Sequence, residues 1–320
     1  MKYNSSKGGI VSFLLFCSIS LFAFQGQYPY PLKSFPISME RTDVKIVYMD
    51  VPSQHPKGKS VILFHGKNFD GAYWRDVIPV LNDLGYRVIV PDQLGFGSSD
   101  KPNIHYSFHQ MASNCRALLD SLHIDKVTVI GHSMGGMLAT RFSLLFGSQI
   151  EKLVLENPIG LEDYKTFVPY TDLGTLYKQE LSASYDSYKK YQQTYYPVWK
   201  PEYEWLVKEQ AGALAKPDFA ETAWANALTY QMIYEQPVCY EFKNIKIKTL
   251  LILGTFDRTI IGKGRLTKKL IDEHGQYQKL GKQVHEQIKG STLVELPGVG
   301  HIPHIQAFDS FKKSIVEFLK

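Results

Sequence analysis

Short, almost wholly apolar stretches alternate along this chain with segments whose apolar residues recur at helical spacing. Stretches without a polar face are typical of strands buried on both sides, as in parallel sheets covered by helices. We therefore predict an α/β fold with a mostly parallel sheet and helices on both faces. The predicted strands are 44–51, 60–66, 86–92, 126–133, 150–158, 247–255 and 291–298, and the predicted helices are 72–85, 107–124, 135–147 and 307–320.

The alternation stops for about ninety residues before the strand at 247–255, a gap far longer than a crossover helix needs. Residues 161–242 of this gap hold twelve of the chain's twenty tyrosines and three of its four tryptophans. We interpret 161–242 as a helical cap (lid) on a core formed by 27–160 and 243–320. Four residues of the cap recur at helical spacing and are expected on one helix face: Leu181, Tyr185, Tyr188 and Tyr195.

The first 26 residues have the pattern of a targeting segment. Lys2 and Lys7 precede an uncharged apolar run at 8–24, about as long as the apolar part of a signal peptide or slightly longer. We expect a signal peptide that is removed on export to the periplasm or outside the cell. An N-terminal membrane anchor is the alternative, and the only membrane contact expected. No other run reaches about 18 apolar residues.

Charge and cysteine spacing limit the classes of partner, metal and cofactor that we expect. The net charge of +5 is modest, and no arginine-rich helix or basic stripe is present, so we expect no nucleic-acid partner. Cys115 and Cys239 lie far apart and lack metal-site spacing, while His301 and His304 form an isolated pair without an acidic neighbour. We therefore predict no metal, no cofactor and a small-molecule substrate; the oligomeric state is not predictable.

Ser133 lies in a Gly-x-Ser-x-Gly pentapeptide, Gly131 to Gly135, between a predicted strand and a predicted helix. In this context the pentapeptide predicts a sharp turn that lifts the serine hydroxyl above the sheet. Gly131 and Gly135 are needed because a Cβ atom at either position would collide with the neighbouring strand or helix. Ser133 is therefore the candidate nucleophile.

A serine hydroxyl needs a base, and the base needs an acid that orients it. Asp257 lies two residues past the strand 247–255, and His301 lies just past the strand at 291–298. The order Ser133, Asp257, His301 is the order of catalytic residues in the hydrolase fold that carries this turn. Alternatives to be weighed are His132 and His304 as the base and Glu162 or Asp163 as the acid.

An oxyanion hole requires two backbone N–H donors near the nucleophile. We predict Met134, directly after the serine, and Lys67, in the loop after the strand 60–66, with Asn68 as the alternative to Lys67. Residues near these loops are the candidate substrate contacts: His65, Gly66, Asn68, Trp74 and His132.

Five motifs follow one another in the chain: "HGKNFDGAYW" (65–74), "DQLGFGSSDKP" (92–102), "GHSMGG" (131–136), "GTFDRT" (254–259) and "GVGHIPH" (298–304). Together they resemble the signatures of the α/β-hydrolase superfamily, in the capped branch with epoxide hydrolases, haloperoxidase-type esterases and carbon–carbon bond hydrolases. The resemblance implies an eight-stranded, mostly parallel sheet with a helical cap inserted after strand six. Ser133 stands where epoxide hydrolases carry aspartate, which disfavours that chemistry.

These observations predict a serine esterase that cleaves a carboxylic ester or related acyl bond of a small to medium, partly apolar substrate through an acyl-enzyme. Carbon–carbon hydrolases usually carry asparagine before the serine, so His132 favours an ester. Carbon–carbon bond hydrolysis and perhydrolase chemistry remain alternatives because they use the same triad. A non-catalytic binding protein on this fold is the remaining alternative, and an intact triad argues against it.

Overall fold

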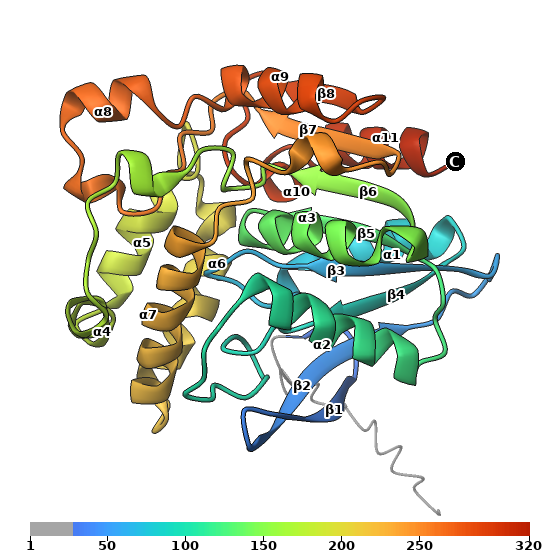
Figure 1. Ribbon diagram of the computed structural model, residues 1–320, viewed down its shortest axis with the longest axis horizontal. Coiled ribbons are helices and arrows are strands. Elements are labelled where there is room, and N and C mark those ends of the chain that lie inside the picture. Colours follow the sequence, from blue (N-terminus) through green and yellow to red (C-terminus); the bar gives the residue numbers. More distant parts are fainter. Residues whose placement is uncertain (1–27) are drawn as a thin grey trace, which may run out of the picture.

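The computed structural model describes residues 28–320, so the predicted leader at 1–26 lies outside the described residues. Its centre is one eight-stranded sheet with the order β1-β2-β4-β3-β5-β6-β7-β8 (Figure 1). β2 pairs antiparallel with β1 and β4, and all the other neighbours pair in parallel. The strands are β1 (Leu32–Met39), β2 (Thr42–Val51), β3 (Lys59–Phe64), β4 (Tyr86–Pro91), β5 (Val127–His132), β6 (Ile150–Glu156), β7 (Thr249–Gly254) and β8 (Thr292–Leu296).

β1 is a strand that the apolar pattern did not predict. It pairs with β2 over its whole length, from Leu32 to Met39. It lies at the sheet edge and most of its side chains are exposed, so its sequence carries no buried apolar run. Pro36 fits there because an edge strand does not need every N–H for the ladder.

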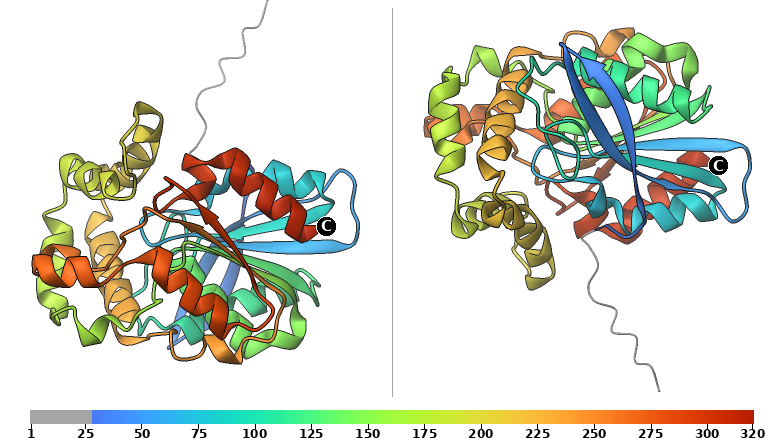
Figure 2. Two further views of the ribbon diagram at one scale, coloured as in Figure 1. Left: turned by 90° about the horizontal axis from the view of Figure 1, so that it is seen from above. Right: turned by 90° about the horizontal axis from the view of Figure 1, so that it is seen from below.

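Helices cover both faces of the sheet, as predicted (Figures 1 and 2). One apolar cluster joins α2, α3 and α9 to one face, and a second joins α1 and α11 to the other. The core helices are α1 (Val77–Asp83), α2 (Phe108–Ser121), α3 (Met134–Phe146), α8 (Lys268–Glu273), α9 (Tyr277–Gln287), α10 (Pro303–Gln306) and α11 (Phe308–Leu319). No helix within residues 28–320 is both long and apolar enough to cross a membrane.

The cap segment forms a group of helices beyond one end of the sheet, on the side where β6 and β7 end (Figure 1). They are α4 (Leu173–Leu181), α5 (Tyr185–Gln193), α6 (Glu204–Ala211) and α7 (Phe219–Glu235). The expected single face of Leu181, Tyr185, Tyr188 and Tyr195 is wrong. A reciprocal cap between Ser184 and Ser187 starts a new helix after Leu181, and Tyr195 follows the end of α5.

Candidate active site

Ser133 occupies the sharp turn between β5 and α3, with φ 57° and ψ −122°, a conformation that L-residues rarely adopt. Two glycines make this turn sterically possible. A Cβ on Gly131 would lie 2.3 Å from the carbonyl oxygen of Gly135, and a Cβ on Gly135 would lie 2.1 Å from that of Phe64. The pentapeptide therefore forms a strained, tightly packed turn at the end of a central strand.

Three side chains form a hydrogen-bonded chain at this turn. His301 Nε2 lies 2.9 Å from Ser133 Oγ, and His301 Nδ1 lies 2.7 Å from Asp257 Oδ2. A carboxylate can only accept, so Nδ1 carries the proton and Nε2 is left to accept from the serine hydroxyl. Asp257 and His301 are almost completely buried, whereas Ser133 keeps 6% of its surface exposed and lines a cavity. This arrangement can activate a serine hydroxyl.

Asp257 is held in its charged form. Burial raises the pKa of this carboxyl, but His301 and hydrogen bonds from Asn157 and Thr259 outweigh burial, so the pKa is lowered overall. The Asn157 amide donates to Oδ2 at 2.7 Å, and the Thr259 N–H donates to Oδ1 at 2.8 Å. An ionised Asp257 orients His301 and stabilises the imidazolium that forms when His301 accepts a proton.

Asn157 supports this arrangement, and the sequence analysis missed it. It directly follows β6, has φ 35°, and accepts from the Gly254 N–H at 3.0 Å while donating to Asp257. It therefore fixes the end of β7 and the carboxylate together. The available signal was its position near the end of a predicted parallel strand, at the sheet edge that also carries Ser133.

The alternative acids lie elsewhere. Glu162 accepts from His274 at 2.7 Å and from the Gly275 N–H at 2.9 Å. Asp163 caps a short helical turn and accepts from the Tyr240 hydroxyl at 2.9 Å. Neither carboxylate contacts His301, so Asp257 alone of the three acids is placed to orient it.

His304, one of the alternative bases, belongs to a separate buried pair. Its ring and its backbone N–H both bind Glu156 Oε1, at 2.9 and 2.7 Å, and its ring stacks on Trp74. Both residues are buried, with 1% of the side-chain surface exposed for His304 and none for Glu156. The pair packs behind the serine turn and does not contact Ser133 Oγ.

The loop after β3 lies against the nucleophile. A Cβ on Gly66 would lie 3.1 Å from Ser133 Cβ, and the Phe69 N–H donates to the Gly66 carbonyl to close a turn. Within residues 28–320, the backbone N–H groups of Lys67 and Met134 have no acceptor. Two unpaired donors beside a serine hydroxyl are what an oxyanion hole requires.

One buried hydrogen-bond chain joins this loop to the base. The Gly66 N–H donates to Tyr73 Oη at 2.9 Å, Tyr73 Oη lies 3.0 Å from His132 Nδ1, and His132 Nε2 lies 2.8 Å from the His301 carbonyl. Burial and the neighbouring His301 lower the pKa of His132 well below its usual range, so its ring is neutral. Because the carbonyl can only accept, His132 donates from Nε2 and accepts the Tyr73 hydroxyl at Nδ1.

The candidate substrate contacts separate into two groups. Asn68 lines the cavity beside Ser133, and Gly66 supports the loop next to it. His65, Trp74 and His132 are fully buried and line no part of that cavity. They pack beneath the site, which corrects the expectation that they contact substrate.

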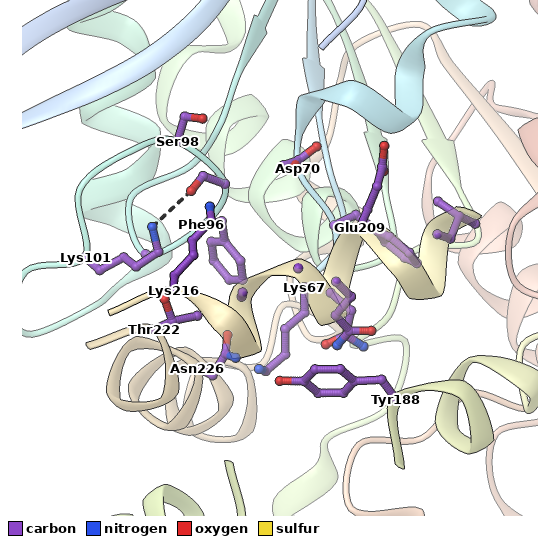
Figure 3. Close-up of a pocket in the computed structure, with 18 residues that line it drawn as sticks. Lys67, Asp70, Phe96, Ser98, Lys101, Tyr188, Glu209, Lys216, Thr222 and Asn226 are labelled. Carbon is purple, nitrogen blue, oxygen red and sulfur yellow. Dashed lines mark hydrogen bonds between the residues drawn. The ribbon is translucent and has the colours of Figure 1, made fainter. Parts of the chain in front are cut away.

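Two adjoining cavities lie between core and cap. The cavity beside Ser133, here called the serine cavity, has a volume of about 180 Å³. The second, the side cavity, has a volume of about 150 Å³ and is shown in Figure 3. Four residues line both cavities: Lys67, Asn68, Tyr188 and Gln210. The serine cavity and the side cavity therefore share one wall.

Tyr195 of the cap is joined directly to the catalytic loop. Its carbonyl accepts the His301 N–H at 2.7 Å, and its hydroxyl accepts from the Asn68 amide at 2.8 Å. The Tyr195 ring also lies 4.8 Å from the His301 ring, centroid to centroid. This part of the cap is a fixed wall of the site.

No cluster of three potential metal-binding side chains occurs among residues 28–320. The residue set around Ser133 suits acyl transfer. Residues 59–308 match the family model of the alpha/beta hydrolase fold. The chain belongs to the α/β-hydrolase family.

Solved structures agree with this α/β-hydrolase assignment. A crystal structure described as a probable hydrolytic enzyme from Pseudomonas aeruginosa is 43% identical, with a TM-score of 0.90, covering 92% of this chain and 95% of that one. A bromoperoxidase from Bacillus anthracis, 21% identical with a TM-score of 0.68, covers 90% of this chain and 99% of its own. The second likeness concerns the fold alone.

A curated relative matches over a shorter span. The 2-hydroxy-6-oxo-2,4-heptadienoate hydrolase of Pseudomonas putida is 36% identical over 108 residues. That match covers 32% of this chain and 39% of the relative's length. The matched region is therefore less than half of either chain.

Proposed function

We propose that this α/β-hydrolase is a serine esterase that cleaves a carboxylic ester or related acyl bond of a small substrate. The observation that carries the proposal is the Ser133–His301–Asp257 hydrogen-bond chain at a cavity of about 180 Å³. A cavity of this size is below the usual range for drug-sized ligands, which favours a short acyl or alcohol group.

The proposed reaction has two steps. His301 accepts the proton of Ser133 as the serine oxygen attacks the substrate carbonyl, and Asp257 stabilises the imidazolium. The N–H groups of Met134 and Lys67 stabilise the oxyanion. His301 then returns the proton to the leaving alcohol, and the same residues activate a water molecule that releases the acid and frees Ser133.

Carbon–carbon bond hydrolysis is the second candidate. The partial identity to the heptadienoate hydrolase of Pseudomonas putida favours it. His132 before the serine favours an ester. Its two ring nitrogens bind the Tyr73 hydroxyl and the His301 carbonyl.

The test is hydrolysis of p-nitrophenyl acetate, butyrate and octanoate by the wild-type protein and by Ser133→Ala. We expect kcat/KM to be highest for the short esters and to fall by about 10³-fold or more in the variant. Ser143→Ala, which removes another buried hydroxyl on α3, is the matched control and should keep its activity. Equal activity of Ser133→Ala and wild type would overturn the proposal.

A further inference from the structure

The side chain of Lys67 has a setting that the oxyanion role of its backbone does not explain. It lines both the serine cavity and the side cavity. In Figure 3 it points toward Tyr188 of α5 and Asn226 of α7, between core and cap. Its charged end is therefore presented to the space that a substrate on Ser133 would occupy.

The Lys67 ammonium has no partner among residues 28–320. It donates no hydrogen bond and has no carboxylate within ion-pair distance. Burial lowers the pKa of this ammonium, and the more distant Glu180 carboxylate opposes that effect. An ammonium that lines a cavity without an ion-pair partner can form a charge-assisted hydrogen bond to an anion placed beside it.

The acidic groups of the two cavities already have partners. Glu180, the other charged residue of the serine cavity, accepts from the Asn226 amide at 3.2 Å. Glu209 of the side cavity forms an ion pair with Arg75 at 2.8 Å. In the serine cavity, Lys67 is thus the charged group whose hydrogen-bonding capacity remains for a ligand.

We propose that the Lys67 ammonium binds an anionic group of the substrate, so that the preferred ester carries a carboxylate. The inference rests on the proposed function, since the carboxylate belongs to the ester attacked by Ser133. A charge-assisted hydrogen bond from Lys67 orients the ester in the cavity, with the charged end directed toward the side cavity.

Two ester pairs test this inference. The first pair is the anion mono-4-nitrophenyl adipate and its neutral partner methyl 4-nitrophenyl adipate, in which the charge lies on the acyl side of the ester bond. The second pair is the anion 4-acetoxybenzoate and its neutral partner methyl 4-acetoxybenzoate, in which the charge lies on the alcohol side. The measured quantity is the ratio of kcat/KM for the anionic ester to that for its neutral partner. Circular dichroism verifies the fold of each variant.

In at least one pair, Lys67→Met should lower this ratio by about 10- to 100-fold, the range expected for a hydrogen bond to a charged group. Lys67→Arg should keep the preference for the anion, and Glu180→Gln should increase it by removing a repelling carboxylate. Lys312→Met removes an equal charge from the exposed face of α11 and should leave the ratio unchanged. An unchanged ratio in Lys67→Met for both pairs overturns the inference while leaving the esterase proposal intact.

Failure of the proposed function would look different. The wild-type protein would then hydrolyse neither the anionic nor the neutral esters. Calorimetric binding of monomethyl adipate to the wild type and to Lys67→Met would still decide the inference. Binding that is weakened about 10-fold or more in Lys67→Met supports it, and equal or absent binding in the two proteins overturns it.

Discussion

Tyr73 joins the oxyanion loop to the catalytic base through one hydroxyl. It accepts from the Gly66 N–H and donates to His132, which in turn binds the His301 carbonyl. Every group in this chain is buried, so loss of the hydroxyl leaves the Gly66 N–H and His132 Nδ1 without a partner. The hydroxyl therefore positions two separate parts of the site at once.

Tyr73→Phe should lower the free energy of unfolding by about 1–3 kcal/mol, the usual effect of unpaired buried groups. It should also lower kcat by about 10-fold, because the N–H of Lys67 and the ring of His301 lose their shared support. Tyr86→Phe is the control, since that buried hydroxyl makes a long 3.5 Å contact to the Leu319 carbonyl and takes no part in this chain. This role would be contradicted if Tyr73→Phe and Tyr86→Phe lost equal amounts of unfolding free energy, measured in urea, and showed equal losses of kcat.

The sequence predicted that Ser133, Asp257 and His301 lie together because each lies at or just past the end of a predicted parallel strand, and such strands end at one sheet edge. It did not predict the supporting chain. His132 and His301 are 169 residues apart, and their bond depends on how two loops approach each other in the folded protein. Local pattern carries no information on such a pairing, so His132 was assigned to substrate contact.

At the scale of elements, the loop after β8 and the cap meet without room for a side chain. A Cβ on Gly300 would lie 2.0 Å from the Tyr195 carbonyl oxygen, which accepts the His301 N–H. The cap backbone therefore helps to determine where the base lies.

Gly300→Ala should reduce kcat/KM by about 100-fold, because the added methyl group displaces either Tyr195 or His301. It should also reduce stability by about 1–3 kcal/mol, as overpacking does. Gly264→Ala is the control, since nothing lies within 4 Å of its added Cβ. Full activity of Gly300→Ala would mean that this contact between cap and catalytic loop does not position His301.

The central strands and the long insertion were predictable because burial on both faces and a break in the alternation are visible in the sequence. β1 was not, because an exposed edge strand has no buried run. The break between α4 and α5 was also missed. Aromatic spacing suggested one helix, but capping by Ser184 starts a second one.

At the scale of the whole molecule, an ion pair between Glu209 of α6 and Arg75 links cap and core. Burial raises the pKa of Glu209 to about 7, although Arg75 opposes the shift. The folded pKa lies above that of the unfolded chain, so the unfolded chain loses this proton first. Stability from Glu209 is therefore present below about pH 4.5 and lost as pH rises to about 7.

Glu209→Gln removes this dependence. The free energy of unfolding is compared between the wild type and Glu209→Gln. The wild-type value minus the variant value should fall by about 1–3 kcal/mol between pH 5 and pH 7.5. Urea unfolding at the two pH values measures the difference. Glu317→Gln, on the exposed face of α11, is the control and should parallel the wild type. A difference that stays constant or rises with pH would contradict the account.

The central claim is that His301 activates Ser133 as a nucleophile. Intact-protein mass spectrometry after treatment with a fluorophosphonate tests it most directly, because an activated serine forms a bond to phosphorus as fluoride leaves. The account predicts one adduct per folded chain, located on the peptide that contains Ser133 and lost in Ser133→Ala. Absence of an adduct on the folded wild-type protein, or an equal adduct on Ser133→Ala, would contradict it.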